Sequence, residues 1–243
     1  MRRFLAACAI AALAAGCSPS EDQSNKNDQS SGDADAARIR GPITPAATEA
    51  PSGEYKIDKT HTSVVFRVDH IGFSNYTAHF AGVDGSLNLD TKDPAKSSLA
   101  ATIETRSLSL IAPPAGFVDT LLSDKWLNAA AFPTITFRST KVELTGSNSA
   151  KITGDLTLRG VTRPVTLDAT FNGGYAGHPY DPAARVGFSA RGVLKRSEFG
   201  VSEGLPPPGS TMGVGDDVTI EIETEFNGPA MAKPPAPPAE ATP

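Results

Sequence analysis

The sequence predicts an antiparallel all-β domain, and three observations support this fold class. Apolar and polar residues alternate in many short runs between residues 54 and 227. Helical spacing of apolar residues occurs in a single segment of this region. The residues on either side are polar or rich in proline and alanine, so they cannot bury enough apolar surface to form a core of their own.

The alternation is clearest near the end of the region, where Val218, Ile220 and Ile222 are separated by Thr219 and Glu221. Successive side chains of a strand point to opposite faces, so this pattern indicates a strand with one apolar and one wet face. The other runs with this period lie at residues 64–68, 76–80, 86–89, 99–105, 135–137, 152–158, 165–171 and 186–194. We therefore predict about eight or more strands.

One segment near the middle of the chain breaks the two-residue period. Phe117 and Leu121 have helical spacing, and Ser123 is placed to cap a second turn that carries Trp126. Pro133 ends the segment. We predict a short helical insertion that closes one end of a barrel or a sandwich.

Alternation alone does not distinguish two packed sheets from one closed sheet. A sandwich fills its interior with side chains, whereas a closed barrel of about eight strands can hold a small ligand. On periodicity and composition, both architectures stay open.

The first 17 residues have the pattern of a secretory signal peptide. Arg2 and Arg3 precede an apolar stretch at residues 4–15, which is too short to span a membrane. The ending "LAAGC" resembles the lipobox of bacterial lipoproteins, although Leu13 lies four residues before Cys17 instead of the usual three. We expect lipidation at Cys17, with plain secretion after cleavage nearby as the alternative.

The position of the cysteines favours the lipoprotein interpretation. Cys8 lies inside the segment that would be removed, so the exported chain has only Cys17 and cannot form an internal disulfide. Ser18 is not acidic, and by resemblance to known sorting rules this favours the outer membrane. We expect a periplasmic protein that is lipid-anchored to that membrane.

The regions around the domain have a different composition. We predict that residues 18–53 form a disordered tether and that residues 228–243 form a Pro/Ala-rich disordered tail. One domain at residues 54–227 remains. The net charge of −5 and the lack of a basic stripe with interleaved aromatic residues exclude nucleic acid as an expected partner.

Four stretches, taken in order, resemble the YceI-like family of bacterial periplasmic polyisoprenoid-binding proteins. They are "YKIDKTHTSVVFRVDHIGFSNYTAHFAG", "LLSDKWLNAAAFPTITFRS", "GDLTLRGVTRPVTL" and "LKRSEFGV". Two departures are Thr120, where many members have histidine, and the Pro/Gly-rich loop at residues 205–217, which does not match the family pattern.

The resemblance implies an extended eight-stranded antiparallel lipocalin-like barrel with a short helical insertion and an apolar tunnel. Family members hold a polyprenyl chain there, such as an isoprenoid quinone or a related amphiphile. We therefore expect a membrane-tethered binding protein that sequesters or carries such a lipid, with no separate cofactor. Whether it forms a homodimer stays open.

The predicted ligand-binding residues are the apolar positions that share one face of the strands or of the helical insertion, with His70 near the polar head of the ligand. They are Val64, Phe66, Val68, His70, Tyr76, Phe80, Ile103, Phe117, Leu121, Trp126, Ile135, Phe137, Leu156, Leu158, Val165, Leu167, Phe188, Val218 and Ile220.

The four histidines, His61, His70, His79 and His178, do not have the spacing of a metal site. As members of the family pattern, His61 and His70 are expected to fix the ends of the first strands by hydrogen bonding.

The sequence has no nucleophile elbow and no phosphate-binding glycine loop, so we expect neither a metal nor a catalytic residue. Two alternatives stay open: an enzyme acting on an isoprenoid lipid, with His61 or His70 as base, and a structural module whose barrel is packed solid.

Overall fold

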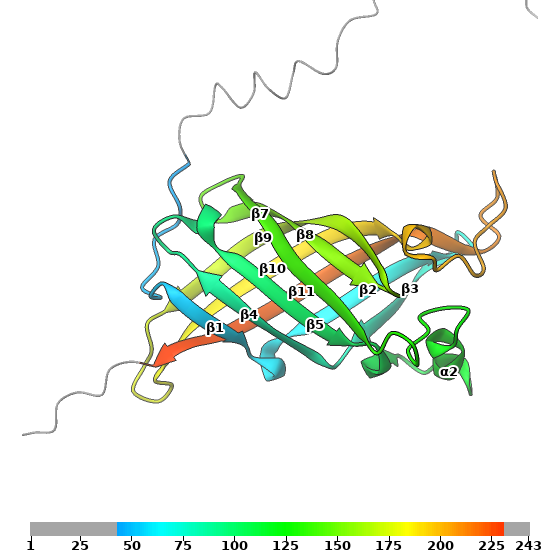
Figure 1. Ribbon diagram of the computed structural model, residues 1–243, viewed down its shortest axis with the longest axis horizontal. Coiled ribbons are helices and arrows are strands. Elements are labelled where there is room, and N and C mark those ends of the chain that lie inside the picture. Colours follow the sequence, from blue (N-terminus) through cyan, green and yellow to red (C-terminus); the bar gives the residue numbers. More distant parts are fainter. Residues whose placement is uncertain (1–42, 231–243) are drawn as a thin grey trace, which may run out of the picture. The chain divides into compact units, whose positions relative to one another are not determined.

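The computed structural model describes residues 43–230, which form one antiparallel sheet of eleven strands (Figure 1). The strands are β1 Gly53–Ile57, β2 Ser63–His70, β3 Ser74–Phe80, β4 Val83–Leu89, β5 Ser98–Glu104, β6 Leu108–Leu110, β7 Thr134–Leu144, β8 Ser149–Leu158, β9 Val161–Tyr175, β10 Ala183–Lys195 and β11 Val214–Ala230. The helical elements are η1 Lys59–His61, η2 Pro94–Lys96, η3 Thr105–Ser107, α2 Phe117–Leu122 and η4 Arg196–Phe199. None of these helices has the length and apolar character needed to cross a membrane.

The eleven strands form a closed barrel of eight long strands, three of which each consist of two shorter strands. The hydrogen-bonded order β1-β4-β5-β7-β8-β9-β10-β11 returns to its start through pairing of β11 with β1. Strands β2, β3 and β6 continue β1, β4 and β5 along the same wall, because β2 pairs with β11 and β3, and β6 pairs with β3. The eight-stranded antiparallel barrel predicted from the family resemblance is therefore confirmed, and the sandwich is excluded.

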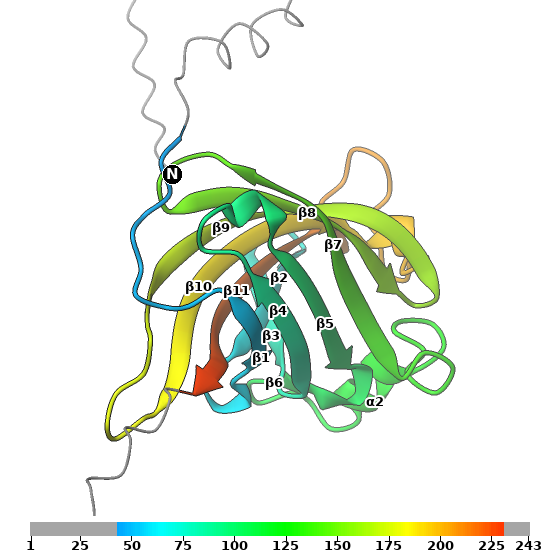
Figure 2. The same ribbon diagram turned by 60° about the vertical axis from the view of Figure 1, so that its left-hand side comes forward.

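The barrel has two different ends (Figures 1 and 2). We call one the loop end; it carries the connections at residues 71–73, 111–133, 159–160 and 196–213. We call the other the mouth end; it carries the start of β1, the end of β11 and the connections at residues 90–97, 145–148 and 176–182.

The two-residue period decides which side chains face the interior. On β11, Ile220 and Ile222 lie opposite Phe66 and Val64 of β2, and all four face inward. The intervening Glu221 lies on the outer face, where it pairs with Arg67 and Arg191. The alternation of apolar and polar residues along the strands therefore gives the barrel an apolar interior and a charged exterior.

Two apolar clusters fill parts of this interior. The loop-end cluster includes Phe80, Ile135 and Phe199, and α2 packs against it through Phe117 and Leu121. The mouth-end cluster surrounds Tyr55, whose side chain is 0% exposed. The Tyr55 hydroxyl donates to the carbonyl of Pro51 at 2.7 Å, which satisfies the one polar group of this buried ring.

The helical insertion differs in detail from the prediction. Phe117 and Leu121 lie on α2 as predicted, but α2 ends at Leu122. Ser123 does not cap a second helical turn; its hydroxyl donates backward to the carbonyl of Thr120 at 2.7 Å, and residues 124–127 form turns. Trp126 instead packs near Arg196, whose guanidinium carbon lies 5.3 Å from the centre of the indole.

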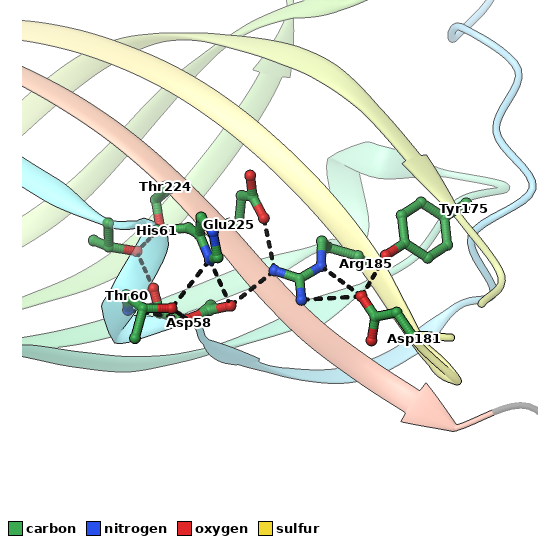
Figure 3. A network of polar contacts seen from close by, with 9 residues as sticks. Asp58, Thr60, His61, Tyr175, Asp181, Arg185, Thr224 and Glu225 are labelled. Atoms are coloured by element: carbon green, nitrogen blue, oxygen red, sulfur yellow. Dashed lines mark hydrogen bonds and ion pairs between the residues drawn. The ribbon is translucent and has the colours of Figure 1, made fainter. Parts of the chain in front are cut away.

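The barrel closes where β1 and β2 meet β11, at a break in the strand around Asp58 (Figure 3). The backbone N–H of Asp58 donates to the carbonyl of Glu225 on β11 at 2.9 Å. Its carboxylate accepts hydrogen bonds from the N–H and the hydroxyl of Thr60, and one carboxylate oxygen lies 3.0 Å from Nδ1 of His61. His61 therefore helps to fix the end of the first strand, as the family resemblance implies.

Arg185 of β10 links this break to the neighbouring strands. Its Nη1 lies 2.8 Å from Asp58 Oδ2 and 2.7 Å from Glu225 Oε2, and its Nη2 lies 3.1 Å from Asp181 Oδ2. Tyr175 at the end of β9 donates to the same Asp181 oxygen at 2.5 Å. We call Asp58, His61, Arg185 and Glu225 the seam network.

The seam network shifts the protonation of its members. Hydrogen bonds from Thr60 and His61, and then from Arg185, hold the pKa of Asp58 far below its usual range. The hydrogen bond to Glu225, and then that to Asp58, raise the pKa of the Arg185 guanidinium. Asp58 is therefore ionised wherever the protein is folded near neutral pH.

We predict that Asp58→Asn lowers the free energy of unfolding at pH 7 by about 2 kcal/mol, because it removes charge-assisted hydrogen bonds from a side chain that is 11% exposed. The folded pKa lies below the unfolded value of about 3.9, so the unfolded chain binds more protons between the two values. The contribution is thus complete above about pH 5 and is lost as the pH falls through the folded pKa.

Urea unfolding of the wild type and the variant at pH 7 and pH 3 measures this effect, and the difference in free energy of unfolding between the two proteins is expected to be smaller at pH 3 than at pH 7. Glu143→Gln is the matched control, because it breaks only an exposed ion pair with Lys141 and is expected to cost less than ~0.5 kcal/mol. A difference between wild type and Asp58→Asn that stays constant down to pH 3 would contradict the assignment.

Candidate functional site

The barrel contains an apolar cavity at the mouth end. The centre of a water-sized sphere can move through about 160 Å³ of it. Room for one water corresponds to ~10–15 Å³ on this measure, so this part of the barrel is not packed solid. Inward-facing side chains of β4, β5 and β7–β11 form the wall, among them Leu87, Leu99, Ile152, Phe171 and Phe188.

A row of small side chains explains why the cavity lies at this level. Ala150 on β8 pairs with Ala169 on β9, which pairs with Ala190 on β10. All three face the cavity and leave the volume that larger side chains would fill. We call these residues the alanine row. The interior at the loop end instead contains large side chains, among them Phe66 and Phe137.

Leu167 forms the inner limit of the cavity. It lines the cavity and also belongs to the loop-end cluster. Gly192 lies opposite Leu167 on β10, and a Cβ atom at Gly192 would lie 2.7 Å from Cδ2 of Leu167. Because residue 192 has no side chain, the Leu167 side chain can occupy the space next to it in the barrel interior.

The mouth of the cavity is polar but uncharged. Its rim carries the hydroxyl and amide side chains of Thr48, Thr91, Ser97, Ser98, Ser147, Asn148 and Ser149. Within the described residues, no lysine, arginine, aspartate, glutamate or histidine side chain lines this cavity. The arrangement can bury an apolar chain and offer hydrogen bonds to a neutral polar group at its end.

Residues 43–52, which we call the strap, run along the rim from the β7–β8 hairpin to β1 (Figure 2). The N–H of Ala46 donates to the carbonyl of Ser147 at 2.6 Å, and Pro45, Ala46 and Thr48 line the cavity. Ala50 is buried in the mouth-end cluster. The predicted tether through residue 53 is therefore revised, since residues 43–52 lie against the barrel.

The remaining predicted domain boundaries concern the two ends of the chain. Strand β11 continues to Ala230, so the predicted tail from residue 228 is revised in its first three residues. The predicted signal peptide, Cys17, residues 18–42 and residues 231–243 lie outside the described residues.

The predicted ligand-binding residues separate into groups by depth in the barrel. Leu167 and Phe188 line the cavity. The following residues are buried in the loop-end cluster: Val64, Phe80, Ile135, Leu158 and Val165. The following are half-buried and pack against it: Phe66, Tyr76, Ile103, Phe117, Leu121, Phe137, Leu156 and Ile220. Val68, Trp126 and Val218 are half-buried outside that cluster, and His70 is exposed.

The histidines do not reach the cavity. His61 is exposed at the seam network, and His70 is exposed at the loop end with its ring centre 6.4 Å from that of Tyr76. His70 therefore lies at the end of the barrel opposite this cavity, and its predicted place near the polar head of a ligand stays a prediction. His61 and His70, the two residues considered as bases, therefore do not line this cavity.

One group of side chains has the geometry of a metal site. Ligand atoms of Asp58, His61 and Glu225 lie within 4.8 Å of one another. However, the Arg185 guanidinium bridges Asp58 and Glu225, so a cation already balances both carboxylates. A metal ion would have to compete with this guanidinium, and the donor set does not favour it.

Arg196 is a structural residue that sequence analysis did not recognise. Its side chain is 5% exposed and donates to the carbonyls of Val201, Glu203, Val214 and Gly215. It thereby holds both ends of the long β10–β11 loop. Arg196 lies in the stretch "LKRSEFGV", which is one of the four stretches that resemble the family pattern. The sequence therefore marks this position but does not reveal the structural role of the arginine.

Comparisons with known proteins agree with this architecture. A family model described as YceI-like domain matches residues 55–226. Protein YceI of Escherichia coli O17:K52:H18 is 37% identical over 190 residues, which are 73% of this chain and 90% of that protein.

Two solved structures have the same fold. Burkholderia cenocepacia BcnA matches with a TM-score of 0.60 and 24% identity, over 70% of this chain and 98% of BcnA. A polyisoprenoid binding domain from Saccharophagus degradans, implicated in plant cell wall breakdown, matches with a TM-score of 0.52 and 13% identity, over 72% of this chain and 98% of that domain.

We predict that Ala46→Pro speeds the release of an apolar fluorophore such as 1-aminoanthracene from the cavity. The variant lacks the N–H that bonds to Ser147, and loss of one hydrogen bond corresponds to a change of roughly 2–10-fold. Stopped-flow displacement measures the rate. Ala47→Pro is the control, because its N–H makes no hydrogen bond within the described residues. Equal release rates in both variants would show that the strap does not hold the mouth.

Proposed function

The chain belongs to the YceI-like domain family, and on this premise we propose that it binds the apolar chain of an isoprenoid lipid in the mouth-end cavity. The observation that carries the proposal is the cavity itself, which combines an apolar wall, the alanine row and an uncharged polar rim. The polyisoprenoid-binding description of the Saccharophagus degradans domain supports the ligand class.

The energetics of such a complex are favourable. Burial of apolar surface contributes about 0.8 kcal/mol for each CH₂ group. Several isoprene units in contact with the wall therefore offset the cost of immobilising the ligand and ordering its chain. Because the wall has no charged group among the described residues, most of the affinity depends on the length and branching of the chain.

The rim favours a neutral head group. Seven hydroxyl and amide side chains surround the mouth, from Thr48 to Ser149, and none carries a charge. A quinone or an alcohol can accept or donate hydrogen bonds there without burying an unpaired charge. A pyrophosphate head would find no cationic partner on this rim. We therefore propose a quinone-like or alcohol-ended isoprenoid.

The cellular setting is part of the proposal. The signal peptide pattern and Cys17 support export and lipidation, which would hold the domain at a membrane facing the periplasm. The strap continues from the predicted tether, so the anchored segment joins the domain next to the mouth. In this arrangement the domain sequesters or carries lipid within reach of the membrane that holds it.

The binding function is favoured over the enzymatic alternative. The two histidines considered as bases lie away from the cavity, and one of them is committed to the seam network. The match to a polyisoprenoid binding domain also supports a family of binding domains. The solid-barrel alternative is contradicted by the cavity.

We predict that Ala190→Phe weakens binding of radiolabelled geranylgeraniol by at least roughly tenfold, because the ring fills the middle of the alanine row and displaces several CH₂ groups of the ligand. Equilibrium dialysis against the full chain measures the affinity. Val193→Phe is the matched control, since it adds an aromatic ring to a position on the outer wall that is 59% exposed.

Thermal unfolding of both variants shows whether they are folded. If Ala190→Phe is unstable, Ala190→Leu, which adds less volume, keeps the test valid. Wild-type protein that does not bind geranylgeraniol or a quinone at micromolar concentration, or Ala190 variants that bind as tightly as Val193→Phe, would refute the proposed function.

A further inference from the structure

The loop end has three large apolar side chains that are exposed to solvent. Phe73 in the β2–β3 turn is 82% exposed, Ile111 after β6 is 83% exposed, and Met212 in the β10–β11 loop is 67% exposed. The other exposed large apolar side chains of the described residues are Tyr180 at the mouth end and Val193 on the outer wall. We call Phe73, Ile111 and Met212 the apolar tips.

The loops that carry the tips are held next to one another. The N–H of Ile71 donates to the carbonyl of Gly213 at 2.8 Å, which joins the β2–β3 turn to the β10–β11 loop. Leu110 pairs with Ala78 of β3, so Ile111 leaves the sheet beside the same hairpin. The tips therefore belong to one surface.

The segments that directly carry the tips also lack charge. Residues 71–78, 107–118 and 204–215 contain no lysine, arginine, aspartate or glutamate, although such residues make up 20% of the chain. The charged residues of the loop-end connections lie outside these segments, among them Asp119, Lys125 and Glu203. Arg159 of the β8–β9 turn donates to the carbonyls of Gly200 and Asp124. Uncharged segments with protruding apolar side chains are unusual for a loop region that contacts only water.

The backbone at the tips is strained. In the described residues, the non-glycine residues with positive φ are Ile71, Ala112, Asn128 and Arg159, and all four lie at the loop end. Ile71 and Ala112, with φ of 52° and 47°, lie within two residues of Phe73 and Ile111. A β-branched residue rarely adopts this conformation. Such strain concentrates at functional segments of proteins.

The flanking chain does not offer an apolar cover for this surface. After the predicted signal peptide, residues 18–42 and 231–243 contain only Ile39 and Met231 as large apolar residues. A second copy is also a poor occupant, because three side chains supply much less than the ~800 Å² per partner that a standard protein interface buries. Separate apolar tips on uncharged loops fit instead into the interfacial region of a lipid bilayer.

We propose that the loop end docks on a neutral bilayer surface by inserting Phe73, Ile111 and Met212. This contact is separate from the lipid-binding cavity and from lipidation of Cys17. It orients the barrel so that the mouth end, with its cavity and strap, points away from the bilayer. A domain docked in this way exposes its mouth to an acceptor across the aqueous space.

The test locates the bilayer contact with tryptophan probes in the full chain. Trp126→Phe removes the native indole, and Phe73→Trp and Met212→Trp place a single indole on two separate tips. Tyr180→Trp is the matched control, because Tyr180 is an aromatic residue that is 94% exposed at the mouth end. Each protein is mixed with phosphatidylcholine vesicles whose acyl chains carry bromine, which quenches nearby indoles, and with unbrominated vesicles.

The proposal expects bromine-dependent loss of fluorescence at residues 73 and 212 and no loss at residue 180, with the same result at low and high salt because no charges are involved. Quenching at residue 180 alone, or at none of the three, would overturn it. A concentration-dependent blue shift at residue 73 without vesicles would assign the surface to a second copy and would also overturn it. Ala190→Phe is expected to leave the quenching unchanged, so failure of lipid binding and failure of docking are distinguishable.

Discussion

Closure of the sheet at the seam network is the constraint on which the rest of the structure depends. The strand formed by β1 and β2 is broken at Asp58, and the break is the point where the first strand meets the last. Arg185 connects the two carboxylates of this junction, Asp58 and Glu225, across neighbouring strands. Closure removes the free strand edges and creates an interior that a flat sheet does not have.

The position of the cavity inside the barrel follows from the size of side chains in register. The alanine row spans β8, β9 and β10 at one level, whereas phenylalanine and isoleucine side chains fill the level toward the loop end. A one-residue slip in any of these strands would turn its alanine outward. Strand pairing fixed in part by the seam network thus decides where the cavity lies, and the proposed preference for a neutral head group depends on the uncharged rim.

Sequence periodicity predicted the face of each residue but not its depth along the barrel axis. Most of the predicted lining residues do face inward, yet only Leu167 and Phe188 reach the cavity. The predicted ligand contacts are large apolar side chains, whereas a cavity forms where side chains are small. The alanine row is recognisable only when the cross-strand partners are known. The distinction between barrel and sandwich came from the family resemblance. The strap and the burial of Arg196 depend on tertiary contacts that no local pattern encodes.

Together, these features describe a barrel that opens at the end where the predicted tether joins it and presents apolar tips at the other end. The central claim is that the interior holds an isoprenoid chain. Native mass spectrometry of the exported full chain, before and after incubation with geranylgeraniol, tests this claim most directly. The account predicts a discrete added mass that organic solvent extracts as an isoprenoid compound. A bare protein mass both before and after incubation would contradict it.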